Sequence, residues 1–217
     1  MHTFYHVTYH KNYNCFPDLE VGQQIIAGES YNPFHNYFYN TDENVSVDTP
    51  DGPQSVHYSS YLKYLANGKG FNEYPNPSIL LPNLYGHFKN LSTLNRELIL
   101  ENIRLAHYPQ LPSRFKCLWV TPSYEESAAW IFEFLPGQDK KIVTLTSNSP
   151  IIRVDSNFLP LATDSLGEKE RKAHAYWSGE ESDNPKIEYL FAGTAEIIAV
   201  NSIHLDSKVS ALLGIRE

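Results

Sequence analysis

The stretch CLWVTPSYEESAAW, residues 117–130, has the pattern of a strand that turns directly into a helix. Residues Phe115–Val120 are mostly apolar or aromatic, which favours a strand. Thr121 and Pro122 follow as a helix start, because threonine caps helix N-termini and proline suits the first helical position. The helix is expected to run to about Phe134.

Other strands are predicted on both sides of this stretch, where β-branched, aliphatic and aromatic residues gather. They are Phe4–Thr8, Lys141–Leu145, Ile151–Val154, Ile187–Ala192 and Ala195–Leu205. A hairpin-like turn at Gly193 and Thr194 is expected to join the last two strands.

Three further helices are predicted, of which residues 93–107 are the clearest because their apolar residues recur at helical spacing after a Ser92 cap. The other two are Ser59–Ala66 and residues 164–177. Residues 31–60 and 72–87 are rich in Asn, Tyr, Asp and Pro and are expected to be loops. An insertion or lid is therefore expected around 31–90 in a single domain that spans 1–217.

The composition narrows the classes of partner. The chain has 17 Lys and Arg against 25 Asp and Glu, a formal net charge of -8, and no run of basic residues. This lowers the expectation of a nucleic-acid partner without excluding a local basic groove. No apolar run reaches the ~18 residues of a membrane span, and no secretory signal is visible, so a cytoplasmic protein with no membrane partner is expected.

Metal and thiol chemistry receive little support from the sequence. Cys15 and Cys117 form no C-x-x-C pair, and a buried structural cysteine is the preferred interpretation of Cys117 over a nucleophile. His2, His6 and His10 share one face of the first strand but lack a matching carboxylate motif, so no metal is expected.

Three fragments, residues 5–8, 117–130 and 187–190, carry residues that suit a binding or catalytic site. Taken singly, His6 reads as a packed or surface histidine, and Trp119 and Trp130 read as core aromatics. Glu188 is less ordinary, because it stands between Ile187 and an aromatic residue inside an apolar strand. Its carboxylate therefore belongs either to a solvated face or to a site.

Together the fragments resemble the ADP-ribosyltransferase superfamily, in its diphtheria-toxin-like branch with His, Tyr and Glu as signature residues. They match in order as His6-Val7-Thr8, Trp119-Val120-Thr121, Ala128-Ala129-Trp130 and Glu188-Tyr189-Leu190. The stretches around Arg114 (LPSR) and Tyr176 (YWSG) also resemble a poorly characterised bacterial branch of this superfamily.

Two departures from the family pattern bear on function. Both aromatic positions hold Trp where the family usually has Tyr. Arginine-modifying members have a second Glu two residues before the catalytic one, and this chain has Lys186 there, which disfavours arginine as the acceptor.

The resemblance implies an α+β fold with a split, mostly antiparallel sheet core and flanking helices, and it implies NAD as the substrate. Cleavage of the nicotinamide–ribose bond develops positive charge on the ribose, as in glycoside cleavage. Glu188 would be the catalytic residue that stabilises this charge beside the 2'-hydroxyl. No Gly-rich dinucleotide fingerprint follows a strand, so a Rossmann dehydrogenase is disfavoured.

The resemblance also implies which residues bind NAD. His6 would hold the adenine-side ribose, the backbone of Val7 the nicotinamide amide, and Trp130 with Trp119 the nicotinamide ring. Thr8 and Thr121 would support the two turns. Arg114 and Arg153 are candidates for the pyrophosphate, although a surface or structural role is the preferred interpretation for each. The acidic loop 179–186 would contact the acceptor or lie solvated on the surface.

Several alternatives stay open from the sequence. The acceptor is a protein or a nucleic acid, or it is water, which would make the protein an NAD glycohydrolase. A catalytically silent binding module is the third alternative. Small members of the superfamily are often bacterial toxins, effectors or phage-defence components, so an antitoxin or inhibitor protein is an implied partner.

Overall fold

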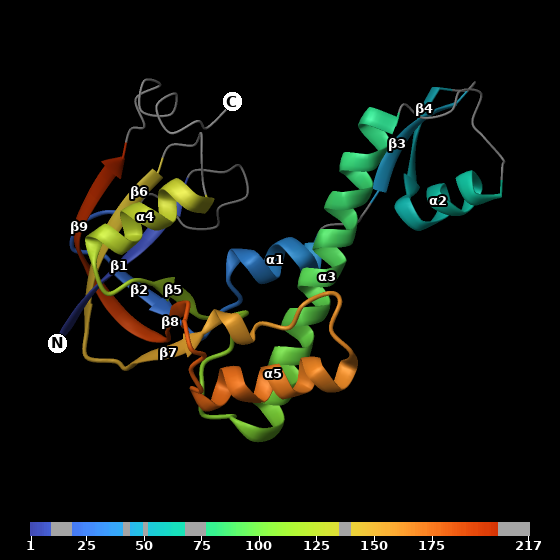
Figure 1. The fold of residues 1–217 in the computed structure, drawn as a ribbon. Helices are drawn as coiled ribbons and strands as arrows, with labels where there is room; N and C mark the ends of the chain where they lie inside the picture. The colour runs from blue at the N-terminus through green and yellow to red at the C-terminus, as the bar shows by residue number, and fades with distance from the viewer. Residues whose placement is uncertain (10–18, 41–43, 50–51, 68–76, 135–139, 204–217) are drawn as a thin grey trace. The chain divides into compact units, whose positions relative to one another are not determined.

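The computed structural model describes residues 1–9, 19–40, 44–49, 52–67, 77–134 and 140–203 (Figure 1). Helices and antiparallel sheets are both present, so the chain is an α+β protein, as predicted. Its contacts divide it into two compact units, one of Met1–Tyr37 with Arg96–Glu217 and the other of Phe38–Asn95.

The first sheet of the larger unit has four strands in the order β1-β6-β9-β2. Their bounds are His2–Tyr9, Lys140–Ser147, Gly193–Ile203 and Gln24–Ala27. Every neighbouring pair is antiparallel. The strands predicted at Phe4–Thr8 and Lys141–Leu145 are confirmed. The structure adds that they pair with each other although they are far apart in the chain.

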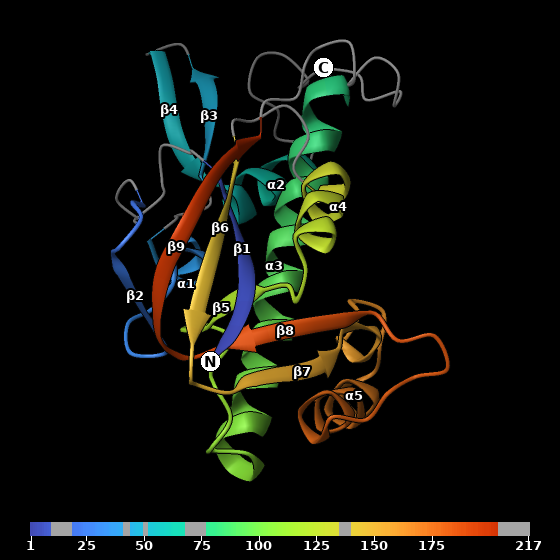
Figure 2. The same ribbon diagram turned by 90° about the vertical axis from the view of Figure 1, so that its left-hand side faces the viewer.

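The second sheet of this unit has the order β5-β8-β7, with bounds Leu118–Val120, Ile187–Phe191 and Ile151–Asp155. Figure 2 shows that its strands cross the direction of the first sheet. The two sheets meet at one bridge, where the backbone groups of Tyr5 and Thr121 exchange hydrogen bonds of 2.9 and 2.8 Å.

The main hydrophobic core lies between the two sheets. Phe4, Leu145 and Ile197 of the first sheet pack with Leu118 and Phe191 of the second, and all five are buried. Burial of a side chain of this size contributes about 1.5–3 kcal/mol. The core therefore holds both sheets against each other and fixes the edge where they join.

The predicted hairpin at Gly193 is wrong, because β8 and β9 belong to different sheets. Gly193 has φ +144°, and a Cβ atom there would overlap the Ser149 side chain. Glycine is suited to such a close approach and to this backbone conformation. The chain thus crosses from one sheet to the other at this residue.

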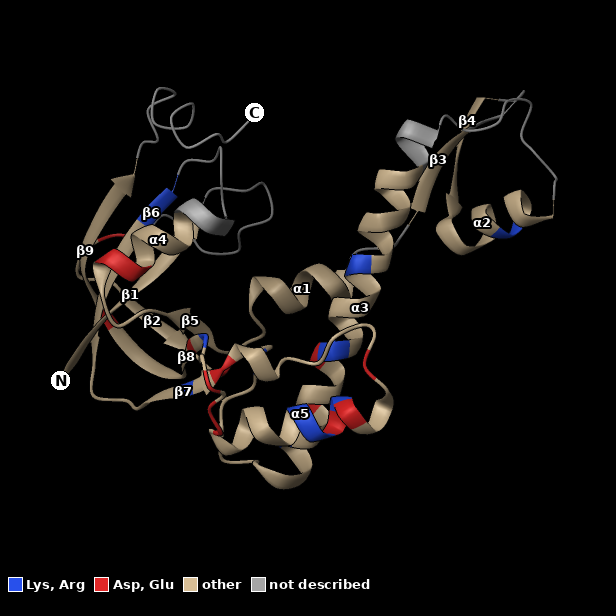
Figure 3. Cartoon of the chain, viewed as in Figure 1, with Lys and Arg blue, Asp and Glu red and all other residues tan. Residues whose placement is uncertain are grey.

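Helices cover both sheets. Helix α4, Tyr124–Phe134, packs on β1 and β6 through Ile131 against Val7 and Ile142. Helix α5, Leu166–Ser178, packs near β7 and the short 3-10 helix η1, Ser156–Phe158. Figure 3 shows acidic and basic residues side by side on α5, where Arg171 pairs with Glu168.

The start of α4 differs from the prediction, which placed the cap at Thr121. Ser123 Oγ accepts the hydrogen bond from the Glu126 backbone N–H, and the Thr121 hydroxyl donates to the Ser123 carbonyl. Thr121 is also bridged to Tyr5, so its backbone continues the strand rather than beginning the helix.

Helix α3, Pro77–His107, contains the predicted helix 93–107 but begins well before it. Ser92 is therefore not a cap, and the loop predicted at 72–87 is wrong from Pro77 onward. Proline at the first helical position is well tolerated, and Pro82 removes one backbone hydrogen bond within the helix. The loop was predicted from the proline-rich composition, but one of these prolines, Pro77, is the first residue of the helix.

The smaller unit also contains regular structure where a loop was predicted over 31–60. Helix α1, Pro33–Asn40, ends in it, and β3, Asn44–Thr49, pairs with β4, Gly52–His57. Helix α2, Tyr58–Ala66, ends at Asn67 as predicted. Tyr58 stacks on His87 of α3 with ring centroids 4.7 Å apart.

Candidate active site

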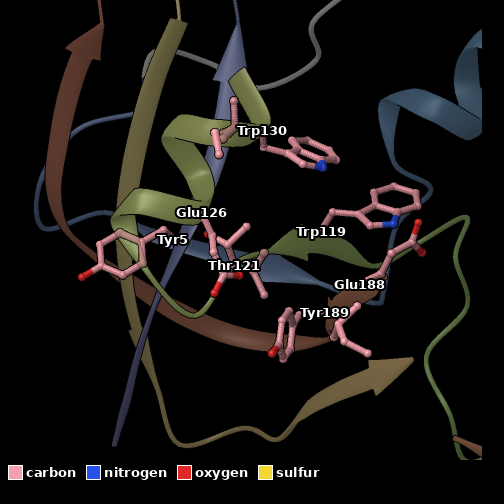
Figure 4. A pocket seen from close by; sticks show the side chains of 11 residues that line it. Tyr5, Trp119, Thr121, Glu126, Trp130, Glu188 and Tyr189 are labelled. Carbon is pink, nitrogen blue, oxygen red and sulfur yellow. The ribbon is translucent and has the colours of Figure 1, made fainter. Parts of the chain in front are cut away.

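A pocket of about 200 Å³ lies where the two sheets meet (Figure 4). Tyr5 and Val7 of β1 line it together with Trp119 of β5, Trp130 of α4 and Glu188 of β8. Thr121, at the bridge between the sheets, lines it as well. The structure thus places five of the predicted site residues, all but His6 and Thr8, in one cavity.

His6 and Thr8 are half-buried and lie on the opposite face of β1 from Val7, because side chains alternate along a strand. His6 Nδ1 lies 2.9 Å from the Trp119 carbonyl oxygen. A carbonyl only accepts, so Nδ1 carries the proton in the neutral ring and Nε2 keeps its lone pair. Burial lowers the pKa of His6 below its ordinary value, although the Trp119 hydrogen bond partly opposes this.

The two tryptophans differ in their surroundings. Trp130 is 40% exposed, whereas Trp119 packs edge-on against Phe34 at 5.8 Å between ring centroids. Figure 4 shows both indole rings extending toward the side on which the Glu188 carboxylate lies. The pocket therefore presents two flat aromatic surfaces and one carboxylate.

Glu188 is held by two hydrogen bonds to the same oxygen. Its Oε2 accepts from Arg114 Nη1 at 2.6 Å and from the Tyr176 hydroxyl at 2.9 Å. The Glu188 side chain is 24% exposed, and the Arg114 side chain is 5% exposed. The carboxylate is thus fixed from the protein side and open on the pocket side.

Arg114 also binds a second carboxylate. Its Nε donates to Glu97 Oε2 at 2.7 Å, and Glu97 in α3 is fully buried. Burial alone would lower the pKa of Arg114, but Tyr176, Glu97 and Glu188 outweigh burial, and the pKa lies well above its ordinary value. Arg114, which the sequence offered as a pyrophosphate or structural residue, is a buried cation between two acids.

Tyr176 of α5 completes this network. Burial raises the pKa of its phenol well above the ordinary value. The charge of Arg114 lowers this pKa, and the charge of Glu188 raises it further. The hydroxyl therefore stays protonated, accepts a hydrogen bond from Arg114 and donates one to Glu188. It ties the acid and the guanidinium together.

The loop directly before Glu188 is anchored by Asp155 at the end of β7. This buried carboxylate accepts hydrogen bonds from Ser182 N at 2.9 Å, Ser182 Oγ at 2.6 Å and Lys186 N at 2.9 Å. Although burial opposes ionisation, the Ser182 hydrogen bonds hold the pKa of Asp155 below its ordinary value. Exposed Arg153 pairs with Glu181 of the same loop rather than with a residue of the pocket.

Cys117 is buried beside this network, and burial raises the pKa of its thiol to about 12. The thiolate needed for nucleophilic attack is therefore scarce at neutral pH. Within the described ranges no group of three or more His, Cys, Asp or Glu side chains is arranged to hold a metal. Cys15 and His10 lie outside the described residues.

Glu97 was not predicted as a site residue from the sequence, and Tyr176 entered only as part of a motif. A signal for Glu97 existed, because helical spacing places it on the same face as buried Leu100 and half-buried Ile103. A carboxylate on an apolar face needs a buried partner, and Arg114 supplies it. Tyr176 had no comparable signal, since a tyrosine in a buried helix face is ordinary.

None of the described helices is long and apolar enough to cross a membrane. No curated protein matches the chain. The model of a family described as "Protein of unknown function (DUF2441)" matches residues 4–205, a range that includes the whole pocket and the Glu97–Arg114–Glu188 network. Since this range covers nearly all of the sequence, the chain belongs to the DUF2441 family.

Proposed function

We propose that this protein cleaves NAD and transfers ADP-ribose to a macromolecular acceptor, with Glu188 as the catalytic residue. One observation carries the proposal: Glu188, Trp119 and Trp130, which are far apart in the chain, line a single pocket at the junction of two antiparallel sheets. The resemblance of the sequence to ADP-ribosyltransferases requires this arrangement of a carboxylate beside two aromatic rings.

The pocket suits the nicotinamide ring of NAD. A planar ring between or beside the indoles of Trp119 and Trp130 gains about 1–3 kcal/mol from stacking. Indoles lack the phenolic hydroxyl of tyrosine and have one N–H donor each, so we expect stacking on the ring faces to be their main contribution. The nicotinamide would leave as a neutral molecule, which such an apolar pocket accommodates.

Glu188 then acts on the ribose. As the bond to nicotinamide breaks, positive charge spreads over the ribose C1 and ring oxygen. Among the described residues no group donates to Glu188 Oε1, so that oxygen is available to the ribose 2'-hydroxyl. The carboxylate stabilises the cationic transition state more than neutral contacts could, and its loss costs about 3 kcal/mol or more.

His6 and the anchored loop have supporting parts in this proposal. The resemblance assigns His6 to the adenine-side ribose, and the hydrogen bond between His6 Nδ1 and the Trp119 carbonyl fixes the orientation of its ring. The loop 179–186, held by Asp155, would present the acceptor next to Glu188. Lys186 in place of a second acid disfavours arginine as that acceptor.

Labelled NAD incubated with the protein and a bacterial lysate tests this function. Label that protease or nuclease releases from macromolecules supports transfer and names the acceptor class. Free ADP-ribose alone would mean hydrolysis, and NAD that is bound but intact would mean a silent binding module. Glu188→Gln should abolish turnover, whereas Glu170→Gln, at an exposed glutamate of α5, should leave it unchanged.

A toxin, effector or phage-defence activity is the biological setting we propose, by analogy with small members of the superfamily. Inducible expression in a bacterium should then slow growth, and Glu188→Gln should restore it. Normal growth with intact cellular NAD on expression of the unaltered protein would contradict this setting, although not the chemistry itself.

A further inference from the structure

We infer that Glu97, Arg114 and Tyr176 are positioning residues that orient the Glu188 carboxylate while leaving its negative charge available to the substrate. This inference rests on the proposed NAD cleavage, because it assigns these residues a part in that reaction. None of the three lines the pocket, and all of them act through Glu188.

The orientation follows from the hydrogen bonds. Arg114 and Tyr176 both donate to Oε2 of Glu188, from β5's preceding loop and from α5 respectively. Two donors from separate elements restrict both the position and the rotation of the carboxylate. Oε1 is thereby held toward the remaining open side, where a ribose hydroxyl would lie.

The charge balance follows from Glu97. An arginine paired with Glu188 alone would cancel most of its charge and weaken its attraction for a cationic ribose. Glu97 is fully buried and lies 2.7 Å from Arg114 Nε, so it neutralises the guanidinium from the other side. Glu97, Arg114 and Glu188 together carry one positive and two negative charges. The net charge of -1 is left at Glu188, which lines the pocket.

Arg96 is a second cation near this network, and its Nη2 lies 2.8 Å from Glu97 Oε1. Its side chain is partly exposed, so solvent screens its charge more strongly than that of Arg114. It therefore weakens the contribution of Glu97 only in part. Replacing Arg96 should therefore change turnover less than replacing Arg114 or Tyr176, which donate hydrogen bonds to Glu188 Oε2.

Tyr176→Phe and Glu97→Gln test the inference with little change in shape. Each should lower kcat for NAD cleavage about tenfold, while KM for NAD changes less than twofold, since binding groups remain in place. Tyr108→Phe and Glu101→Gln are matched controls. Tyr108 contacts His174. Glu101 lies four residues along α3 from Glu97 and pairs with Arg104, so both variants should retain kcat.

Arg114→Lys and Arg114→Met add a rescue test. Lysine keeps the charge but lacks the fork that reaches two carboxylates, so Arg114→Lys should recover part of the kcat that Arg114→Met loses. Each variant's thermal unfolding shows whether it folds. If Arg114→Met does not fold, Tyr176→Phe and Glu97→Gln still decide the question.

A crystal structure of Tyr176→Phe supplies a readout that does not need turnover. The Glu188 carboxylate should shift from its place beside Arg114 or occupy two rotamers. If it keeps its place and kcat is unchanged in both Tyr176→Phe and Glu97→Gln, the positioning inference is overturned. If the unaltered protein does not cleave NAD, the proposed function fails, and the crystal structure still reports on the orientation of Glu188.

Discussion

Tyr5 and Thr121 exchange two backbone hydrogen bonds, and this single bridge joins the edge strands of the two sheets. It brings the half of β1 that holds Val7 next to the strand that holds Trp119. Val7 and Trp119 both line the pocket, so the bridge joins two of its walls. The candidate site therefore depends on a contact between backbone groups, in addition to the side chains that line it.

Replacing Trp130 by Ala should weaken NAD binding by about 1–3 kcal/mol, a factor of roughly 5–150, because one stacking surface is lost. Its ring is 40% exposed, so the free energy of unfolding should change by less than ~1 kcal/mol. Calorimetric titration with NAD and thermal unfolding measure the two effects. Trp177→Phe, in the buried core, should show the reverse pattern, with lower stability and unchanged affinity.

Protein stability should fall as the pH drops below 6.5, and His6 should account for part of this. Burial places the pKa of His6 in the folded state below the ordinary value of 6.5, so the unfolded chain binds its proton first. A group of this kind destabilises the fold as the pH falls through that window, by up to about 1.4 kcal/mol per pH unit.

Urea unfolding of the unaltered protein and of His6→Asn between pH 7.5 and 5.5 measures this linkage. Asparagine still donates to the Trp119 carbonyl but does not titrate, so the curve should be flatter. Exposed His2 provides the control His2→Asn, whose curve should match that of the unaltered protein. Parallel curves for His6→Asn and the unaltered protein would contradict the assignment.

Asp155→Asn should loosen the loop before Glu188. The carboxylate accepts from Ser182, Lys186 and Asn157, and an amide has one acceptor oxygen in place of two. At least one buried donor is left unpaired, which costs about 1–3 kcal/mol. Limited proteolysis should then cut faster within residues 179–186.

The pH dependence of this effect has a definite sign. Hydrogen bonds hold the pKa of Asp155 below 3.8, so its stabilisation is present above that pH and disappears as the pH falls further. The stability difference between the unaltered protein and Asp155→Asn should therefore shrink at low pH. A difference that stays constant down to pH 3 would show that ionised Asp155 is not the anchor.

Gly193→Ala should destabilise the larger unit by more than about 1 kcal/mol, because the new Cβ meets Ser149 and the backbone φ is +144°. Ser149→Gly should relieve the overlap and restore part of the stability. Gly86→Ala within α3 is the opposite control: a Cβ there meets nothing within 4 Å, and alanine favours a helix by roughly 0.5–1 kcal/mol. Thermal unfolding of the three variants gives the order.

The strands and helices with strong local patterns were predicted correctly, and those with mixed composition were not. Helix 93–107 and the strand at Phe4–Thr8 had clear periodicity, and both are present. The segments 31–60 and 72–87 contain helices and a strand pair that a high content of Asn, Tyr and Pro concealed. Composition reports the average preference of a segment, whereas contacts with other segments decide its structure.

The sequence by itself predicted most of the strands, and its resemblance to the ADP-ribosyltransferases implied the α+β class and the residues Trp119, Trp130 and Glu188 that come to share a pocket. These features are encoded locally, in periodicity and in short motifs. Only the tertiary structure decided that β8 and β9 lie in different sheets and that Glu97, Arg114 and Tyr176 meet at Glu188. These contacts depend on how separate elements pack. A buried charge needs a hydrogen-bonded partner, and local sequence does not show which residue the folded chain places beside it.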